Sequence, residues 1–454
     1  MSWLPPFLRT YDIPPDARSN YRAELSHTLH WVVLVASIEG TLSSIVVSKT
    51  FGASRLLTTI VWCVPIVANL LNLVWSAALR GRHRVPAMTR VCIAICVAVA
   101  SIGLLPSNSG PWGGWVFAGQ LACAYALVSG LITLRISLWQ ANYPTLQRAQ
   151  IASRIEIITG LAIATIPLAL GTLYDHWSGA YRVVYPAAAV IGLLGLRPLQ
   201  RIVVPREDDE LARMRVHVTT PGDTRARRLW RGVRESLAIF RDDRRYRDYL
   251  IAQFLLGCGN FGTEPILVNV VSKDMALSYA GAVGILTVAR AAVMLATMPF
   301  WSRYFDRAGI YRFRVENSTW WVASFACVTA AMGVWGLGGV SGVAWALVIG
   351  LILVGRVCNG MGSAGGVVAW PLGHLAFASD HRANLYLGLH VALTGLRGLL
   401  MPIVAFVLNA EIGNWSFAVA LALGIASNLM YRKLLREELA SPAGPAGALA
   451  VIAE

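Results

Sequence analysis

Apolar residues in this chain run in blocks of about 20, separated by short polar breaks. A block of this length is what a helix needs to cross the hydrocarbon core of a bilayer. Windows of about 19 residues place twelve such spans, near 27–48, 55–79, 86–105, 112–140, 150–173, 181–198, 249–272, 278–300, 316–338, 342–377, 383–409 and 414–432. The pattern therefore predicts an all-α polytopic membrane protein.

The composition agrees with this prediction and excludes several other classes. The chain is 56% hydrophobic and 14% charged, whereas about a quarter of the residues in a soluble domain are charged. The basic residues that give the net charge of +15 cluster in a few loops, so we expect no nucleic-acid partner. All seven cysteines fall in apolar blocks, where thiols are usually inert. We therefore expect no disulfide framework, metal site or cofactor, and no catalytic motif indicates an enzyme.

The placement of arginine predicts the topology. Arginines are concentrated in the even-numbered turns, in a dense run at the middle of the chain and otherwise at Arg80, Arg82, Arg84, Arg148, Arg303, Arg307, Arg312, Arg314 and Arg382. By the positive-inside rule both termini are then cytoplasmic. Only three of the 39 basic residues are lysines, which suggests GC-rich coding and a bacterial inner membrane. The polar segment 1–26 and the tail 433–454 would lie in the cytoplasm.

The long polar loop 199–247 contains 13 arginines. Its simplest interpretation is a solvated linker between two halves of the protein. The alternative is a helical segment near 225–245 that lies on an anionic lipid surface.

An internal repeat divides the spans into two sets of six. Short matches recur in the same order at offsets of 224 to 235 residues, and they are Tyr21-Arg22 with Tyr246-Arg247, Val47-Ser48-Lys49 with Val271-Ser272-Lys273, Arg148-Ala149 with Arg382-Ala383, Thr159-Gly160-Leu161 with Thr394-Gly395-Leu396, and Pro167 with Pro402. The repeat predicts two homologous six-helix bundles, 27–198 and 248–432. Because each has an even number of spans, both have the same topology, related by an axis along the membrane normal.

The turn between spans 8 and 9 contains a family signature. Asp306, Arg307, Gly309 and Arg312 match the pattern G-x-x-x-D-R-x-G-x-x-R, with Ser302 in place of the leading glycine. With this turn and the six-plus-six organisation, the chain resembles the major facilitator superfamily. The resemblance covers about residues 20–436. The resemblance implies a transporter fold in which these four residues control conformation. The equivalent 2–3 turn, residues 75–84, is shorter and lacks the acid that helps to lock the outward-facing state in the family.

Charged residues inside a bilayer are costly and usually mark function or a buried pair. Of 24 acids only Glu39, Glu156 and Glu264 fall in the interior of the predicted spans, and Glu39 and Glu264 each follow a Tyr-Arg pair at the same spacing. The resemblance implies that their spans line a central cavity, where two carboxylates suit proton or cation coupling. Asn260 lies one turn before Glu264 and shares its face. The alternative is that each carboxylate is permanently paired with an arginine.

Four of the arginines in the apolar blocks could balance these acids or bind the cargo. Arg135 is at a similar depth to Glu156 on the neighbouring span, which predicts a structural or gating salt bridge. Arg290, Arg356 and Arg397 lie near mid-depth in the C-terminal half. They would suit an anionic group on the cargo, because a guanidinium binds carboxylate or phosphate well. The alternative is that they bond helix carbonyls, or Glu39 across the two halves.

These observations favour a secondary active transporter that moves a small organic or amphiphilic solute by alternating access. We expect a monomer in the bilayer, with protons as the coupling ion. Two alternatives remain open at this point, an uncoupled exchanger or facilitator and a transporter-like scaffold or receptor that moves nothing.

Overall fold

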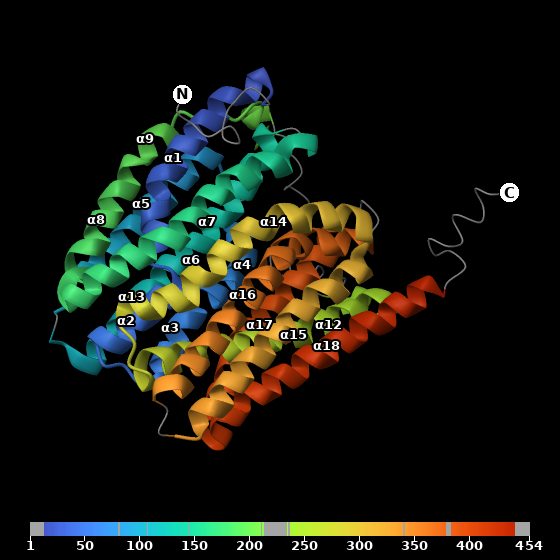
Figure 1. Cartoon of the computed structure of the whole chain (residues 1–454). Coiled ribbons are helices and arrows are strands. Elements are labelled where there is room, and N and C mark those ends of the chain that lie inside the picture. Colours follow the sequence, from blue (N-terminus) through green and yellow to red (C-terminus); the bar gives the residue numbers. More distant parts are fainter. Residues whose placement is uncertain are drawn as a thin grey trace. The chain divides into compact units, whose positions relative to one another are not determined.

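The computed structural model describes residues 13–79, 82–106, 108–143, 145–209, 211–212, 234, 237–338, 341–377 and 383–440 (Figure 1). Within these residues every regular element is a helix. Contacts divide the chain into two units. Unit 1 comprises residues 1–225 with 268–288, and unit 2 comprises residues 226–267 with 289–454.

Unit 1 is a bundle of helices that pack mainly side by side. Its α-helices are α1 (Arg18–Ser37), α2 (Gly40–Thr50), α3 (Arg55–Ala68), α4 (Asn72–Leu79), α5 (Arg84–Ala100), α6 (Gly110–Asn142), α7 (Thr145–His176), α8 (Tyr181–Leu194), α9 (Leu196–Leu199) and α13 (Tyr279–Val283). Helix α1 packs against α7 and α8, α5 packs against α6 and α8, and α3 packs against α6. The π-helical segments η6 (Val270–Asp274) and η7 (Gly284–Val288) flank α13.

Unit 2 contains the remaining long helices. They are α12 (Arg244–Asn269), of which the last two residues belong to unit 1, α14 (Ala289–Ala308), α15 (Ile310–Gly336), α16 (Gly342–Leu372), α17 (Ala383–Ile412) and α18 (Ser416–Leu439). Helix α15 packs against both α16 and α18, and α14 packs against α16. In both units the long helices leave apolar side chains exposed, such as Val97, Val190 and Leu429 at 64%, 57% and 60%.

The helices account for the twelve predicted spans. Nine helical runs in the described residues are long and apolar enough to cross a membrane, and the last of them, Leu389–Leu439, contains most of α17 and all of α18. The shorter apolar run Arg55–Leu71 and α15 correspond to spans 2 and 9. Helices satisfy their own backbone hydrogen bonds, as lipid requires. The predicted all-α polytopic fold is confirmed.

The first span differs from the prediction in its start and in its continuity. Helix α1 begins at Arg18, and Tyr21, Glu24 and Leu25 are buried, so the first helix starts before the predicted span 27–48. The span is also broken, because α1 ends at Ser37 and α2 begins at Gly40.

The boundaries of the second half differ as well. Helix α12 begins at Arg244 and α18 extends to Leu439, so both helices reach beyond the predicted bundle 248–432. Residues 268–288, predicted within the bundle 248–432, make their contacts with unit 1. Of the segment considered near 225–245, the structure describes residues 234 and 237–245.

Candidate functional site

A buried ion pair lies in unit 2 between α12 and α16. Arg356 Nη1 donates to Glu264 Oε1 over 2.6 Å, and the two side chains are 2% and 5% exposed. Asn359 Nδ2 donates to the same oxygen over 3.1 Å. The Asn359 amide is itself oriented, because its Oδ1 accepts from Ser363 Oγ over 3.2 Å. The structure thus brings together Glu264 and Arg356, two of the residues that the sequence selected.

Glu39, the repeat-equivalent of Glu264, has a different environment in unit 1. It occupies the break between α1 and α2, where it is the N-cap of α2 and accepts from Leu42 N over 2.9 Å. The Tyr125 hydroxyl donates to the neighbouring Ile38 carbonyl over 2.7 Å. A carboxylate is favoured at a helix N-terminus, where it satisfies a free N–H and the helix dipole. The repeat predicted the matching positions of the two carboxylates but not their different partners.

The other residues of unit 2 that the sequence selected are Asn260, Arg290 and Arg397. Asn260 and Arg290 are both half-buried, on α12 and α14. Arg397 is buried on α17, where its Nη1 donates to the Gln253 carbonyl over 2.8 Å and its guanidinium lies over the Phe261 ring at 4.8 Å. For Arg397 the structure therefore matches the alternative of bonding to a helix carbonyl.

A second polar cluster lies between α1, α6 and α7 in unit 1. Arg135 Nη1 lies 3.4 Å from Glu156 Oε1, the partner that the sequence suggested. Arg135 Nε also lies 3.5 Å from Glu24 Oε1. Glu24 is the more buried acid, and it accepts hydrogen bonds from Trp139 Nε1 and, over 2.7 Å, from the Tyr143 hydroxyl.

Sequence reasoning missed Glu24 because residue 24 precedes the apolar block. The residues around it follow a helical spacing, with Tyr21, Leu25 and Thr28 all buried on one side of α1. That spacing was a signal for an earlier helix start. No signal in the sequence indicated which aromatic residues would surround the carboxylate.

The turn between α14 and α15 has the backbone that its signature requires. Gly309 has φ of +68° and is the N-cap of α15, a conformation that only glycine adopts without strain. Arg307 and Arg312 are exposed. The Asp306 side chain lies outside the described residues, so its predicted gating contacts remain a prediction.

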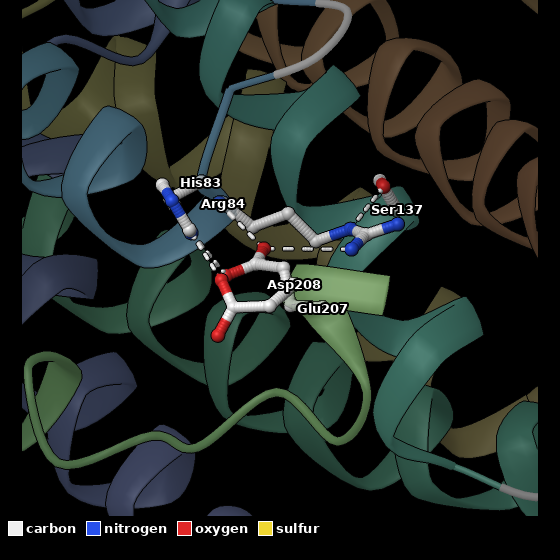
Figure 2. A network of polar contacts seen from close by, with 5 residues as sticks. All are labelled: His83, Arg84, Ser137, Glu207 and Asp208. Carbon is white, nitrogen blue, oxygen red and sulfur yellow. Dashed lines mark hydrogen bonds and ion pairs between the residues drawn. The ribbon is translucent and has the colours of Figure 1, made fainter. Parts of the chain in front are cut away.

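The equivalent turn before α5 receives a carboxylate from elsewhere in the chain. Figure 2 shows Glu207, from the segment that follows α9, beside His83 and Arg84. Glu207 Oε1 accepts from Arg84 N over 2.8 Å and lies 3.4 Å from Arg84 Nη1, while Oε2 lies 3.1 Å from His83 Nδ1. Arg84 Nε donates to Ser137 Oγ on α6 over 2.8 Å. The acid missing from residues 75–84 is therefore supplied by the start of the linker.

Residues 268–288 make many polar contacts with other parts of unit 1. Asp175 at the end of α7 accepts from Tyr279 N over 2.6 Å and from Ala280 N over 2.9 Å, the first two N–H groups of α13. Arg55 and Asp274 form an ion pair of 2.5 Å.

Further hydrogen bonds join this segment to α2, to α3 and to the turn between them. Asn269 Nδ2 donates to Thr59 Oγ1 over 3.2 Å. The Thr50 and Tyr279 hydroxyls lie 3.0 Å apart, and Lys273 Nζ donates to the Ala53 carbonyl. The segment is thus held at several points along its length.

Comparison with known proteins identifies the family. A sequence model of the Major Facilitator Superfamily matches residues 31–355, more than half of the chain. The chain belongs to the major facilitator superfamily. No curated protein sequence matches it.

Solved transporters share this major facilitator fold. A mutant of the peptide transporter POT in complex with sulfate is 13% identical, with 92% of this chain and 94% of that one covered and a TM-score of 0.65. A D-xylose-proton symporter is 13% identical, with coverages of 92% and 97% and a TM-score of 0.62. The xylose transporter XylE from E. coli, in an inward-open conformation, is 14% identical, with coverages of 92% and 96% and a TM-score of 0.61. At these identities the likeness shows the fold alone.

Proposed function

We propose that this major facilitator protein is a proton-coupled secondary transporter of a small organic solute, working by alternating access. The observation that carries the proposal is the buried Glu264–Arg356 pair with Asn359 beside it. An ion pair this deep in an apolar bundle has lost most of its hydration, which costs several kcal/mol per ion in proteins. A hydrophobic pair of similar volume would often be at least as stable, which favours a functional reason for its presence.

The proposed coupling is an exchange of partners at Arg356. While Glu264 is ionised, its carboxylate occupies the guanidinium of Arg356. When Glu264 takes up a proton, Arg356 becomes a buried cation without its counter-ion, and an anionic group of the cargo can then replace the carboxylate. Proton binding and cargo binding therefore favour each other, which is the coupling that a gradient-driven transporter needs.

Glu39 has a separate role in this proposal. As the N-cap of α2 it stabilises the break in the first span, so its neutralisation weakens the helix end rather than the coupling. Discontinuous helices are also typical of transporter cargo sites, so the break between α1 and α2 supports a transport role for unit 1.

The cargo class stays broad. A peptide transporter and a xylose–proton symporter are among the structural neighbours, and both kinds of solute belong in a first screen. The main alternative is an uncoupled exchanger or facilitator in which Glu264 and Arg356 are paired permanently. In that case the pair stabilises the fold and does not release its carboxylate during transport.

The test is solute-induced proton movement in proteoliposomes. Vesicles that contain a pH-sensitive dye, with valinomycin and potassium to clamp the voltage, are exposed in turn to dipeptides, pentoses and monocarboxylates. Wild-type protein should move protons in response to at least one solute, and Glu264→Gln should abolish that response while retaining solute counterflow. The matched control is Glu411→Gln, at an exposed carboxylate on α17, which should behave as wild type. Counterflow of a solute by wild-type protein without any proton movement would support the uncoupled alternative.

A further inference from the structure

A second cationic cluster in unit 2 lies apart from the Glu264 pair and involves Arg314 on α15 and Arg397 on α17. Their exposed fractions are 1% and 5%. In the part of the chain that the structure describes, no carboxylate lies within ion-pair distance of either guanidinium. Buried charges in proteins are normally paired, so two neighbouring cations without a counter-ion require an explanation.

The groups around these arginines are neutral. Arg314 Nε and Nη2 donate to the Tyr249 hydroxyl over 2.9 and 2.7 Å, and Nη2 also donates to the Ala369 carbonyl over 3.2 Å. Arg397 Nη1 donates to the Gln253 carbonyl, while Gln253 Oε1 accepts from the Tyr431 hydroxyl over 2.9 Å. These contacts orient the guanidinium groups but do not balance their charge.

Unused donors remain in the cluster. Arg397 Nε has no hydrogen-bond partner, and neither does Nε2 of His390, which is 3% exposed. His390 precedes Arg397 by two helical turns on the same face of α17, and it is within electrostatic range of both Arg314 and Arg397. The guanidinium of Arg314 on α15 thus lies near the guanidinium of Arg397 and the imidazole of His390 on α17.

The backbone also makes room for this arrangement. A side chain at Gly257 of α12 would collide with the Arg397 guanidinium, so a larger residue there would displace that group from its present position. Tyr249, Gln253 and Gly257 follow one another at intervals of four residues and therefore lie along one face of α12. Three successive turns of α12 therefore contact the two arginines.

We infer that Arg314, Arg397 and His390 form a binding site for a small oxyanion, a carboxylate, phosphate or sulfate group, inside the C-terminal helices. Guanidinium groups bind such anions with short, charge-assisted hydrogen bonds. The inference rests on the proposed function only for the source of the anion, which is either a second anionic group of the cargo or a free inorganic ion. Arg356, which exchanges Glu264 for the cargo in the proposed function, takes no part in this second site.

The test measures sulfate binding to the purified full-length protein in nanodiscs, by labelled-sulfate equilibrium binding and by thermal unfolding at constant ionic strength. Sulfate also stabilises proteins without binding, by exclusion from their surface, so the readout is the difference between variants. Wild-type protein should bind sulfate saturably, and Arg397→Gln and Arg314→Gln should each weaken it about tenfold or more. Arg432→Gln, at an exposed arginine on α18, should bind as wild type.

If Arg397→Gln does not fold, Arg397→Lys keeps the charge without the planar fork and should still weaken sulfate binding. Absence of saturable binding to wild-type protein, or equal binding by all variants, overturns the inference. Displacement of sulfate by a solute that moves protons identifies the cargo as the source of the anion, and independent binding identifies an inorganic ion. Because the assay needs no gradient, its failure is distinguishable from failure of proton coupling.

Discussion

Replacement of Asp175 by asparagine should loosen residues 268–288 from unit 1. Both carboxylate oxygens accept backbone N–H groups, from Tyr279 over 2.6 Å and from Ala280 over 2.9 Å. The third N–H of α13, at Gly281, is accepted by the Ser278 hydroxyl over 3.0 Å. Asp175 therefore satisfies two of the N–H groups that a helix leaves without partners at its start.

The structure sets the size of the effect. An asparagine keeps one oxygen but presents an NH₂ group to the second N–H, so one charge-assisted bond is lost and the other becomes neutral. A hydrogen bond to a charged group contributes about 1.5–3 kcal/mol and a neutral one about 1 kcal/mol. The helix-end charge adds about 0.3–1 kcal/mol. We expect the opening free energy of the segment to fall by about 2–6 kcal/mol, or roughly 30-fold or more in the opening equilibrium.

Hydrogen–deuterium exchange of the peptide that contains Tyr279 and Ala280 measures this opening. Exchange in Asp175→Asn should accelerate by the same factor at these amides, while amides in the middle of α5 and α15 stay protected. Asp16→Asn makes the same chemical change at an exposed position of unit 1 and should leave the peptide unchanged. Equal exchange in wild type and Asp175→Asn would refute the reasoning.

Functional consequences follow from the chain's connectivity. Residues 268–288 continue directly into α12 on one side and α14 on the other. A displacement of either helix relative to unit 1 therefore strains the contacts at Asp175, Arg55 and Thr59. Looser contacts should change the rate of solute counterflow in Asp175→Asn without abolishing solute binding.

Three further predictions concern buried charge and backbone conformation. Glu264→Gln should destabilise the protein by about 3–5 kcal/mol because Arg356 stays buried without the Glu264 carboxylate. Combining it with Arg356→Gln should recover much of that loss in thermal unfolding. If the losses of the two single variants simply add in the double variant, the pairing is contradicted. Glu207→Gln should cost about 1–3 kcal/mol at the linker contact and speed amide exchange at Arg84, whereas Asp208→Asn, whose side chain is 94% exposed, should not; equal exchange in both variants would exclude the Glu207 contact. Gly309→Ala should cost about 1–3 kcal/mol through backbone strain alone, since nothing lies within 4 Å of the added Cβ; an unchanged unfolding temperature would argue against the positive φ.

The sequence was sufficient for the spans and their repeat. Each span needs about 20 apolar residues regardless of its neighbours, so the blocks predict helices before any packing is known. The signature turn was also readable, because the positive φ at Gly309 is a local requirement that restricts the residue type. Such local constraints can be recognised in a single sequence without knowledge of the packing.

The sequence was less informative about which side chains contact one another between helices. The repeat set the depth of Glu264, but its contact with Arg356 rather than with Arg290 or Arg397 depends on how α12 and α16 rotate about their axes. The break at Glu39 depends on the dihedral angles of one residue. Glu207 lies more than 120 residues from Arg84 in the chain, and no spacing rule connects a linker residue with a turn.

The protonation state of Glu264 during cargo binding tests the central claim most directly. Infrared difference spectroscopy on the protein in nanodiscs detects the C=O stretch of a protonated carboxyl group, and the probe is a solute that moves protons in the liposome assay. We predict that addition of this solute produces a carboxylic-acid band in wild-type protein and in Glu411→Gln, and that the band is absent in Glu264→Gln. Binding of the solute by wild-type protein with no such band, or with the same band in Glu264→Gln, would contradict the exchange of partners at Arg356.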